Sequence, residues 1–100
     1  HHTNHHTLSL HDALPIFVMD EDEDSITITD DHGNSITMNG EGIVIESGSD
    51  LTIKSSGDIN LEGVNINIKS QAELKAEGSA AATFSSSGTT TVKGSLIQIN

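Results

Sequence analysis

The chain has 100 residues and a formal net charge of −11, and it is 33% hydrophobic but only 2% aromatic. Aromatic side chains normally supply much of a globular core, and a chain of this length buries only about two-thirds of its unfolded surface even with a good core. The composition therefore disfavours a free-standing globular enzyme. It also disfavours nucleic-acid binding, because four lysines stand against fifteen acidic residues that repel phosphate.

The first sixteen residues differ in composition from the rest, since they contain five of the six histidines and the only proline. Residues 7–16 (TLSLHDALPI) resemble the translation of a sequencing-adapter oligonucleotide. We therefore interpret residues 1–16 as a non-native, adapter-derived and disordered segment, which implies that upstream sequence is missing. A metal site built from the histidines is the alternative. It is disfavoured because a terminal cluster without a second shell binds metals adventitiously. Those histidines are His1, His2, His5 and His6.

The next segment, residues 17–24, ends in the acidic run DEDED. The run fits the first, third and fifth positions of a calcium loop. Ser25, however, stands where that loop needs glycine, and Asp31 stands where it needs a bidentate glutamate. We therefore predict a solvated acidic lead-in without a metal ion.

From Ser25 onward, apolar residues recur as pairs separated by one residue, which places both side chains on one face of a strand. The first residues of successive pairs are 10, 7, 8, 8, 7, 8, 8, 8 and 7 positions apart. A recurrence near eight predicts a short strand plus a turn, repeated along the chain. The pairs are 26/28, 36/38, 43/45, 51/53, 59/61, 66/68, 74/76, 82/84, 90/92 and 97/99.

This repeat predicts an all-β fold. A single-chain solenoid of three sides would rise only roughly 15 Å and leave its ends unpaired. Three intertwined chains would instead form a long triangular prism, a β-helix of octapeptide strands in a homotrimer. A lone chain should then expose its Ile and Leu side chains. The predicted trimer core comprises Ile43, Ile45, Leu51, Ile53, Ile59, Leu61, Ile66, Ile68, Leu74, Phe84 and Val92.

Residues 25–47 (SITITDDHGNSITMNGEGIVIES) carry a family resemblance. The D-x-x-G-N turn at Asp30, Gly33 and Asn34, with the I-x-M pair that follows it, resembles the start of the C-terminal needle in VgrG spike proteins of type VI secretion. It is also similar to the central-spike needles of contractile phage baseplates. Residues 56–68 (SGDINLEGVNINI) and the ending VKGSLIQIN continue the resemblance.

The resemblance implies a β-helical needle domain over residues 25–100 and a missing upstream oligosaccharide-binding-like domain. The needle would pierce membranes, touching them only during puncture, and would carry effectors and a tip cap protein of the PAAR type. By position, the implied tip contacts are Leu96, Ile97 and Ile99. Tail tube or hub proteins would bind upstream. The protein would lie in the bacterial cytoplasm before firing and then be injected, or it would lie in a virion tail.

We find no credible catalytic residue and predict no enzyme, no cofactor and no metal. No serine lies in a nucleophile elbow, and the acidic residues Asp50, Asp58 and Glu62 are better explained as solubilising charges than as a glycosidase pair. Some phage spikes carry a His-x-His iron site at the tip, but His32 lies far from the C-terminal end of the chain. An adhesive stalk or fibre segment with a β-solenoid fold remains as the rival function.

Overall fold

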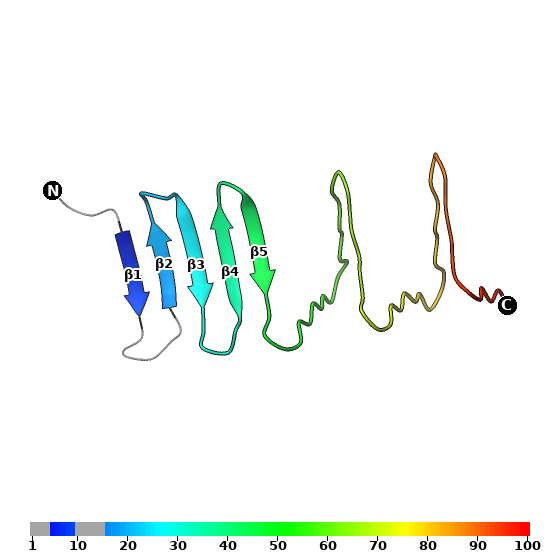
Figure 1. Cartoon of the computed structure of the whole chain (residues 1–100), viewed down its shortest axis with the longest axis horizontal. Helices are drawn as coiled ribbons and strands as arrows, with labels where there is room; N and C mark the ends of the chain where they lie inside the picture. Colours follow the sequence, from blue (N-terminus) through cyan, green and yellow to red (C-terminus); the bar gives the residue numbers. More distant parts are fainter. Residues whose placement is uncertain (1–4, 10–15) are drawn as a thin grey trace. The chain divides into compact units, whose positions relative to one another are not determined.

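The computed structural model describes residues 5–9 and 16–100. Its described residues form an all-β structure with five strands in one antiparallel sheet, in the order β1-β2-β3-β4-β5 (Figure 1). None of the described residues belongs to a helix long and apolar enough to cross a membrane. The strands are β1 (His5–Ser9), β2 (Ile16–Asp20), β3 (Ser25–Thr29), β4 (Ser35–Asn39) and β5 (Gly42–Glu46).

The sheet begins earlier in the chain than the expected start of the needle at Ser25. The sequence predicts disorder for His5–Ser9, but in the structure these residues form β1 and pair with β2. The remainder of that segment, residues 1–4 and 10–15, lies outside the described residues. Ile16–Asp20 form β2, so the lead-in is partly strand, whereas residues 21–24 form an exposed turn between β2 and β3.

The two faces of the sheet differ in polarity. In the register, Ile28 lies opposite Phe17 on one side and Ile36 on the other, and Ile36 lies opposite Ile45. Register partners point to the same face, and so do residues two apart in one strand. A second row, formed by Met19, Ile26, Met38 and Ile43, therefore shares that face. We call these eight side chains the apolar face, and the opposite face is rich in Thr and Ser.

The spacing of the first pairs explains why they form hairpins instead of successive sides of a prism. The ten-residue step leaves five residues, 30–34, to turn between β3 and β4, and the seven-residue step leaves only Gly40 and Glu41 between β4 and β5. Asn39 stabilises the short turn, because its Oδ1 accepts a hydrogen bond from the Glu41 N–H at 2.8 Å. Antiparallel pairing within one chain is therefore complete up to Glu46.

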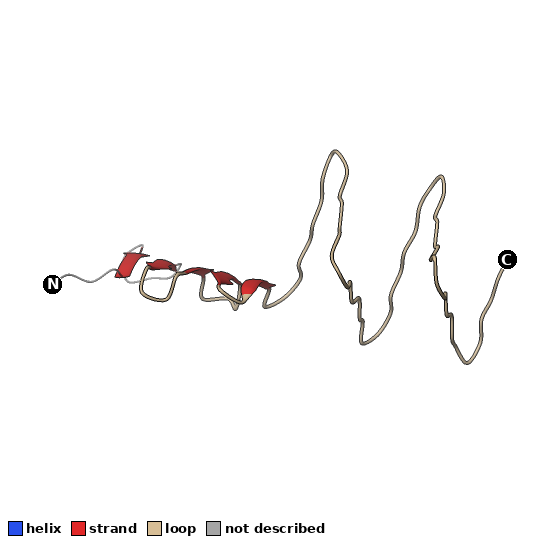
Figure 2. Cartoon of the chain, turned by 90° about the horizontal axis from the view of Figure 1, so that it is seen from above, coloured by secondary structure: helices blue, strands red, loops and turns tan. Residues whose placement is uncertain are grey.

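Beyond Glu46 the prediction of a strand at every apolar pair is wrong for the single chain. Residues 47–100, all of which the structure describes, contain no strand and no backbone-to-backbone hydrogen bond. A strand needs a neighbour for its N–H and C=O groups, and this part of the chain offers itself none. Figure 2 draws it entirely as loop, in tan.

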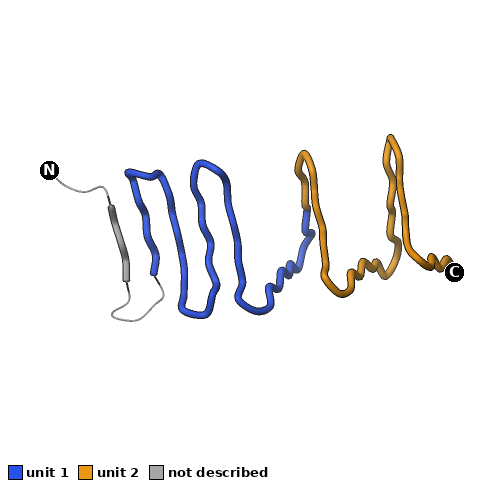
Figure 3. The backbone as a smooth tube through the Cα atoms, in the orientation of Figure 1, with its two compact units in different colours: residues 1–60 blue, residues 61–100 orange. Residues whose placement is uncertain are grey.

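The whole chain falls into two compact units, His1–Asn60 and Leu61–Asn100 (Figure 3). Regular bends nevertheless recur in residues 47–100. Serine hydroxyls hold several of the bends. The Oγ of Ser55 accepts the Gly57 N–H at 3.0 Å, and the Oγ of Ser86 accepts the Gly88 N–H at the same distance. The bends lie at residues 48–49, 56–57, 64, 71–72, 79–80, 87–88 and 95–96.

The β3–β4 turn is held by one carboxylate. Asp30 Oδ1 accepts the N–H groups of His32 at 2.8 Å and of Asn34 at 3.1 Å, while its Oδ2 accepts the Asn34 side-chain amide at 2.8 Å. Gly33 takes a φ of 87°, which a residue without Cβ adopts freely. The pKa of Asp30 lies below its ordinary 3.8. The largest cause is the hydrogen bond from the His32 N–H, and the second is the one from the Asn34 side-chain amide.

The intrachain register can be tested with a double variant, Thr27→Cys with Thr37→Cys. These residues are partners across β3 and β4 on the polar face, and Cα atoms of antiparallel partners lie about 4.5–5.5 Å apart, within reach of a disulfide. We expect the oxidised protein to migrate as a single crosslinked chain on a denaturing, non-reducing gel. Covalent dimers and trimers would instead show that β3 and β4 of different chains pair.

The Asp30 turn makes stability depend on pH. Because the folded-state pKa lies below 3.8, the ionised carboxylate stabilises the fold above pH 3.8, and this contribution is lost as the pH falls through the lowered value. We expect Asp30→Asn to lower the urea midpoint at pH 7 and the deficit to shrink in acid, as followed by circular dichroism. Asp58→Asn is the matched control, and a deficit for Asp30→Asn that stays constant with pH would contradict this role.

Candidate trimer interface

The apolar face of the sheet is uncovered. The strands form a single layer (Figure 2), and no described side chain of the whole protein is buried, whether hydrophobic or polar. Ile43 and Ile45 of the edge strand β5 are 66% and 57% exposed. An uncovered apolar surface of this kind marks a site of association in a soluble protein. The prediction that a lone chain exposes its Ile side chains is confirmed.

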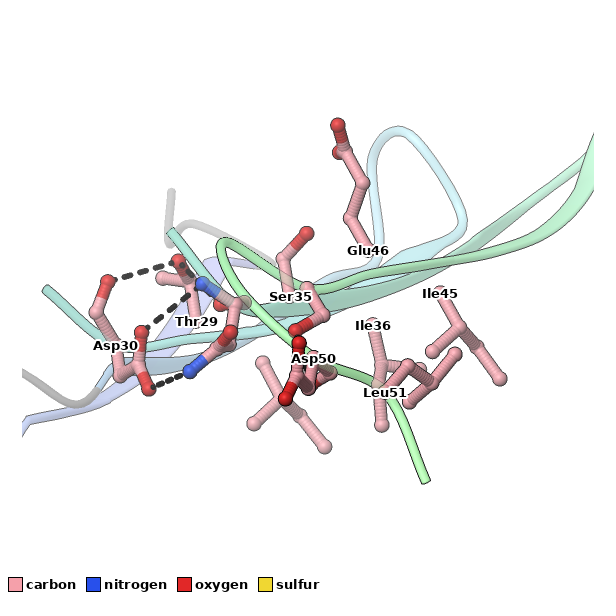
Figure 4. Close-up of a pocket in the computed structure, with 11 residues that line it drawn as sticks. Thr29, Asp30, Ser35, Ile36, Ile45, Glu46, Asp50 and Leu51 are labelled. Atoms are coloured by element: carbon pink, nitrogen blue, oxygen red, sulfur yellow. Dashed lines mark hydrogen bonds between the residues drawn. The ribbon is translucent and has the colours of Figure 1, made fainter. Parts of the chain in front are cut away.

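An open hollow of about 540 Å³ lies at one end of this face (Figure 4). Its apolar wall is formed by Ile28, Ile36 and Ile45 from three adjacent strands and by Leu51, which follows β5. In Figure 4 the side chains of Ile36, Ile45 and Leu51 lie together, while Glu46 points away from them. The polar rim comprises Thr29, Asp30, Asn34, Ser35, Glu46, Ser47 and Asp50.

The chain leaving β5 is tied to the β3–β4 turn beside this hollow. The Gly48 N–H donates to Asn34 Oδ1 at 2.9 Å, across fourteen positions of sequence. Gly48 also lies so close to the turn that an added Cβ would overlap the carbonyl oxygen of His32. Ser47 Oγ donates to the carbonyl oxygen of Asp50 at 2.7 Å and closes the loop.

The predicted trimer core is exposed along its whole length in the single chain. Beyond Leu51 the side chains are uncovered without exception, as illustrated by Ile53 at 70% and Phe84 at 87% exposure. The predicted core does not include six residues of the apolar face. Two of these, Phe17 and Met19, lie in the predicted lead-in, although their alternation in β2 is a signal for a strand with one apolar face. The other four are Ile26, Ile28, Ile36 and Met38.

The predicted tip residues also lie in the open. Leu96 is part of the last bend, and Ile97 and Ile99 follow it on alternate positions. Leu96 and Ile99 are 82% and 88% exposed. The three side chains are therefore accessible, as a partner-binding surface requires.

Acidic residues that could act in catalysis or metal binding do not converge in the described part of the chain. No group of three or more His, Asp or Glu side chains there is arranged to hold a metal ion. Asp50 lies at the rim of the hollow, and Asp58 and Glu62 are exposed. His1 and His2, two of the four histidines of the alternative metal site, lie outside the described residues.

A comparison with protein families matches residues 2–74 to the phage baseplate V C-terminal trimerisation domain. The match covers the whole sheet, the hollow and the first part of the unpaired run, and it includes most of residues 1–16. A comparison with curated protein sequences finds no match. The uncovered apolar surface calls for association with other chains, and the match shows that this chain belongs to the family of phage baseplate V C-terminal trimerisation domains, which have a structural role in the baseplate.

Proposed function

We propose that three copies of this chain form the needle of a contractile injection spike. The proposal is carried by one observation: in residues 51–100, apolar residues alternate and bends recur about every eight residues, yet the chain provides neither cover nor strand partners. In a trimerisation domain the other two chains supply both.

The needle would combine two modes of assembly. The five-stranded sheet has its hydrogen bonds within one chain and needs only cover for its apolar face, so it acts as one wall of a three-walled prism. Residues 51–100 need neighbours for their backbone as well, so they wind around the two other chains as a triangular octapeptide β-helix. The bends become the corners, and the predicted trimer core points to the axis.

Such a needle transmits force. Adjacent strands stack about 4.8 Å apart, and each level is bonded to levels from other chains, so bending requires many hydrogen bonds to break together. Residues 79–91 (SAAATFSSSGTTT) are almost all small and let three backbones approach the axis closely. The protein therefore acts mechanically, without catalysis.

The machine that best accounts for the sequence resemblance is a type VI secretion spike of the VgrG kind, with a phage tail spike as the close alternative. In the first case the protein waits in the bacterial cytoplasm and is injected with its effectors, and in the second it belongs to the virion tail. An adhesive stalk is the rival from another class. An upstream oligosaccharide-binding-like barrel leading to tail tube or hub proteins would decide for the spike.

The variants Ile66→Asp and Asn65→Asp test which side chains of the needle point toward its axis. In the prism, the three chains place their three Asp side chains at position 66 at the same level of the axis. Each carboxylate loses its hydration there without a partner, at a cost of several kcal/mol. We expect Ile66→Asp to abolish the trimer and Asn65→Asp to preserve it, as measured by light scattering. Equal assembly of the two variants, or a well-folded native monomer, would contradict the proposal.

The tip is tested by the double variant Ile97→Asp with Ile99→Asp. In the proposed needle, residues 96–99 form the apolar end of the β-helix, and an apolar sheet end is normally covered by a partner; a PAAR-type cap would fit. We expect the double variant to remain trimeric but to lose capture of the cognate cap in a pull-down. Gln98→Asp, between the two positions, serves as the charge control, and undiminished capture by the double variant would place the cap elsewhere.

A further inference from the structure

We propose that the contact between Asn34 and Gly48 is a latch that fixes the path of the chain where intrachain pairing ends. Through this contact the β3–β4 turn sets the position at which the residues after β5 begin to pair with the other chains, and so fixes their register in the trimer. The inference rests on the proposed needle, and it assigns to the D-x-x-G-N turn a positioning role in assembly.

The latch is built from a rigid turn and one long-range hydrogen bond. The carboxylate of Asp30 accepts three hydrogen bonds from inside the turn, and one of them comes from the side-chain amide of Asn34. That bond orients the amide, so its oxygen faces the Gly48 N–H at 2.9 Å. A backbone bond from the Asp30 N–H to the Asn34 carbonyl oxygen, at 3.2 Å, closes the turn.

Glycine at position 48 is required by this approach. The Cα of Gly33 lies 3.3 Å from the place of an added Cβ at residue 48, and the carbonyl oxygen of His32 lies closer still. Both obstacles are backbone atoms, which cannot move aside as the end of a side chain can. Gly40, in the neighbouring turn, offers the contrast, because nothing lies within 4 Å of an added Cβ there.

The position of the latch determines what it controls. It lies three residues before Leu51, the first apolar residue without a strand, and Leu51 lines the hollow with Ile36 and Ile45. Ser47 and Asp50 close the short loop between them. A slip of one residue here would turn every later apolar pair to the opposite face, so the register of the whole run depends on this loop.

The experiment compares Gly48→Ala with Gly40→Ala in the full chain. Each chain is unfolded in guanidinium, diluted, and followed to trimer by light scattering, and dissociation is measured separately. We expect Gly48→Ala to slow assembly by about tenfold, because the added methyl group prevents the latch from closing before the strands pair. Gly40→Ala should assemble at the native rate. Assembly of Gly48→Ala at the native rate would overturn the latch.

A second variant keeps the test decisive should Gly48→Ala fail to fold. Asn34→Ala removes the acceptor without adding bulk, so in the trimer the Gly48 amide should exchange its hydrogen faster, while the amides of Thr27 and Thr37 in the β3–β4 pair keep their native exchange. Unchanged exchange at Gly48 would overturn the latch. If the native chain itself fails to form trimers, the proposed needle fails, a result separate from either latch outcome.

Discussion

A β-strand forms only where a neighbouring strand can bond its backbone N–H and C=O groups, and this constraint divides the chain at Glu46. Before that point, turns of five and two residues bring neighbouring strands together, so the chain supplies its own partners. After it, alternating apolar residues and regular bends continue without a partner strand in residues 47–100. The need for other chains is therefore strongest in the second half, where it concerns the backbone as well as the side chains.

The apolar face of the sheet also depends on other chains, but only to cover its side chains and not to bond its backbone. Its two rows of aliphatic, Met and Phe side chains are aligned by the strand register, but no described side chain of the protein becomes buried. Burial normally contributes about 25 cal/mol for each Å² of apolar surface removed from water, and in the lone chain most of that contribution is missing. The chain matches a trimerisation domain, and in the proposed needle the two other copies supply that cover.

The sequence pattern predicted the all-β fold class and the common face of the first three apolar pairs, because alternation is a local property of a strand. Ile26, Ile28 and Ile36 share a face as the pattern indicated. What the pattern did not predict was the antiparallel sheet, which depends on how turns such as the one at Asp30 close. It also missed Phe17 and Met19, since the acidic run beside them concealed a shorter alternation in β2. The contact from Asn34 to Gly48 spans fourteen positions, and no local rule reveals a pairing at that distance.

The antiparallel sheet has a consequence for synthesis on the ribosome. Its contacts join neighbours in sequence, and local contacts form quickly once the residues involved have emerged. The sheet can thus be complete while the unpaired run is still being translated. That run carries exposed Ile, Leu and Val, the composition most prone to aggregate through open strand edges. Because it emerges after the sheet, its apolar surface is exposed for a shorter time before partner chains arrive, and polysomes carrying several nascent copies would bring those partners close.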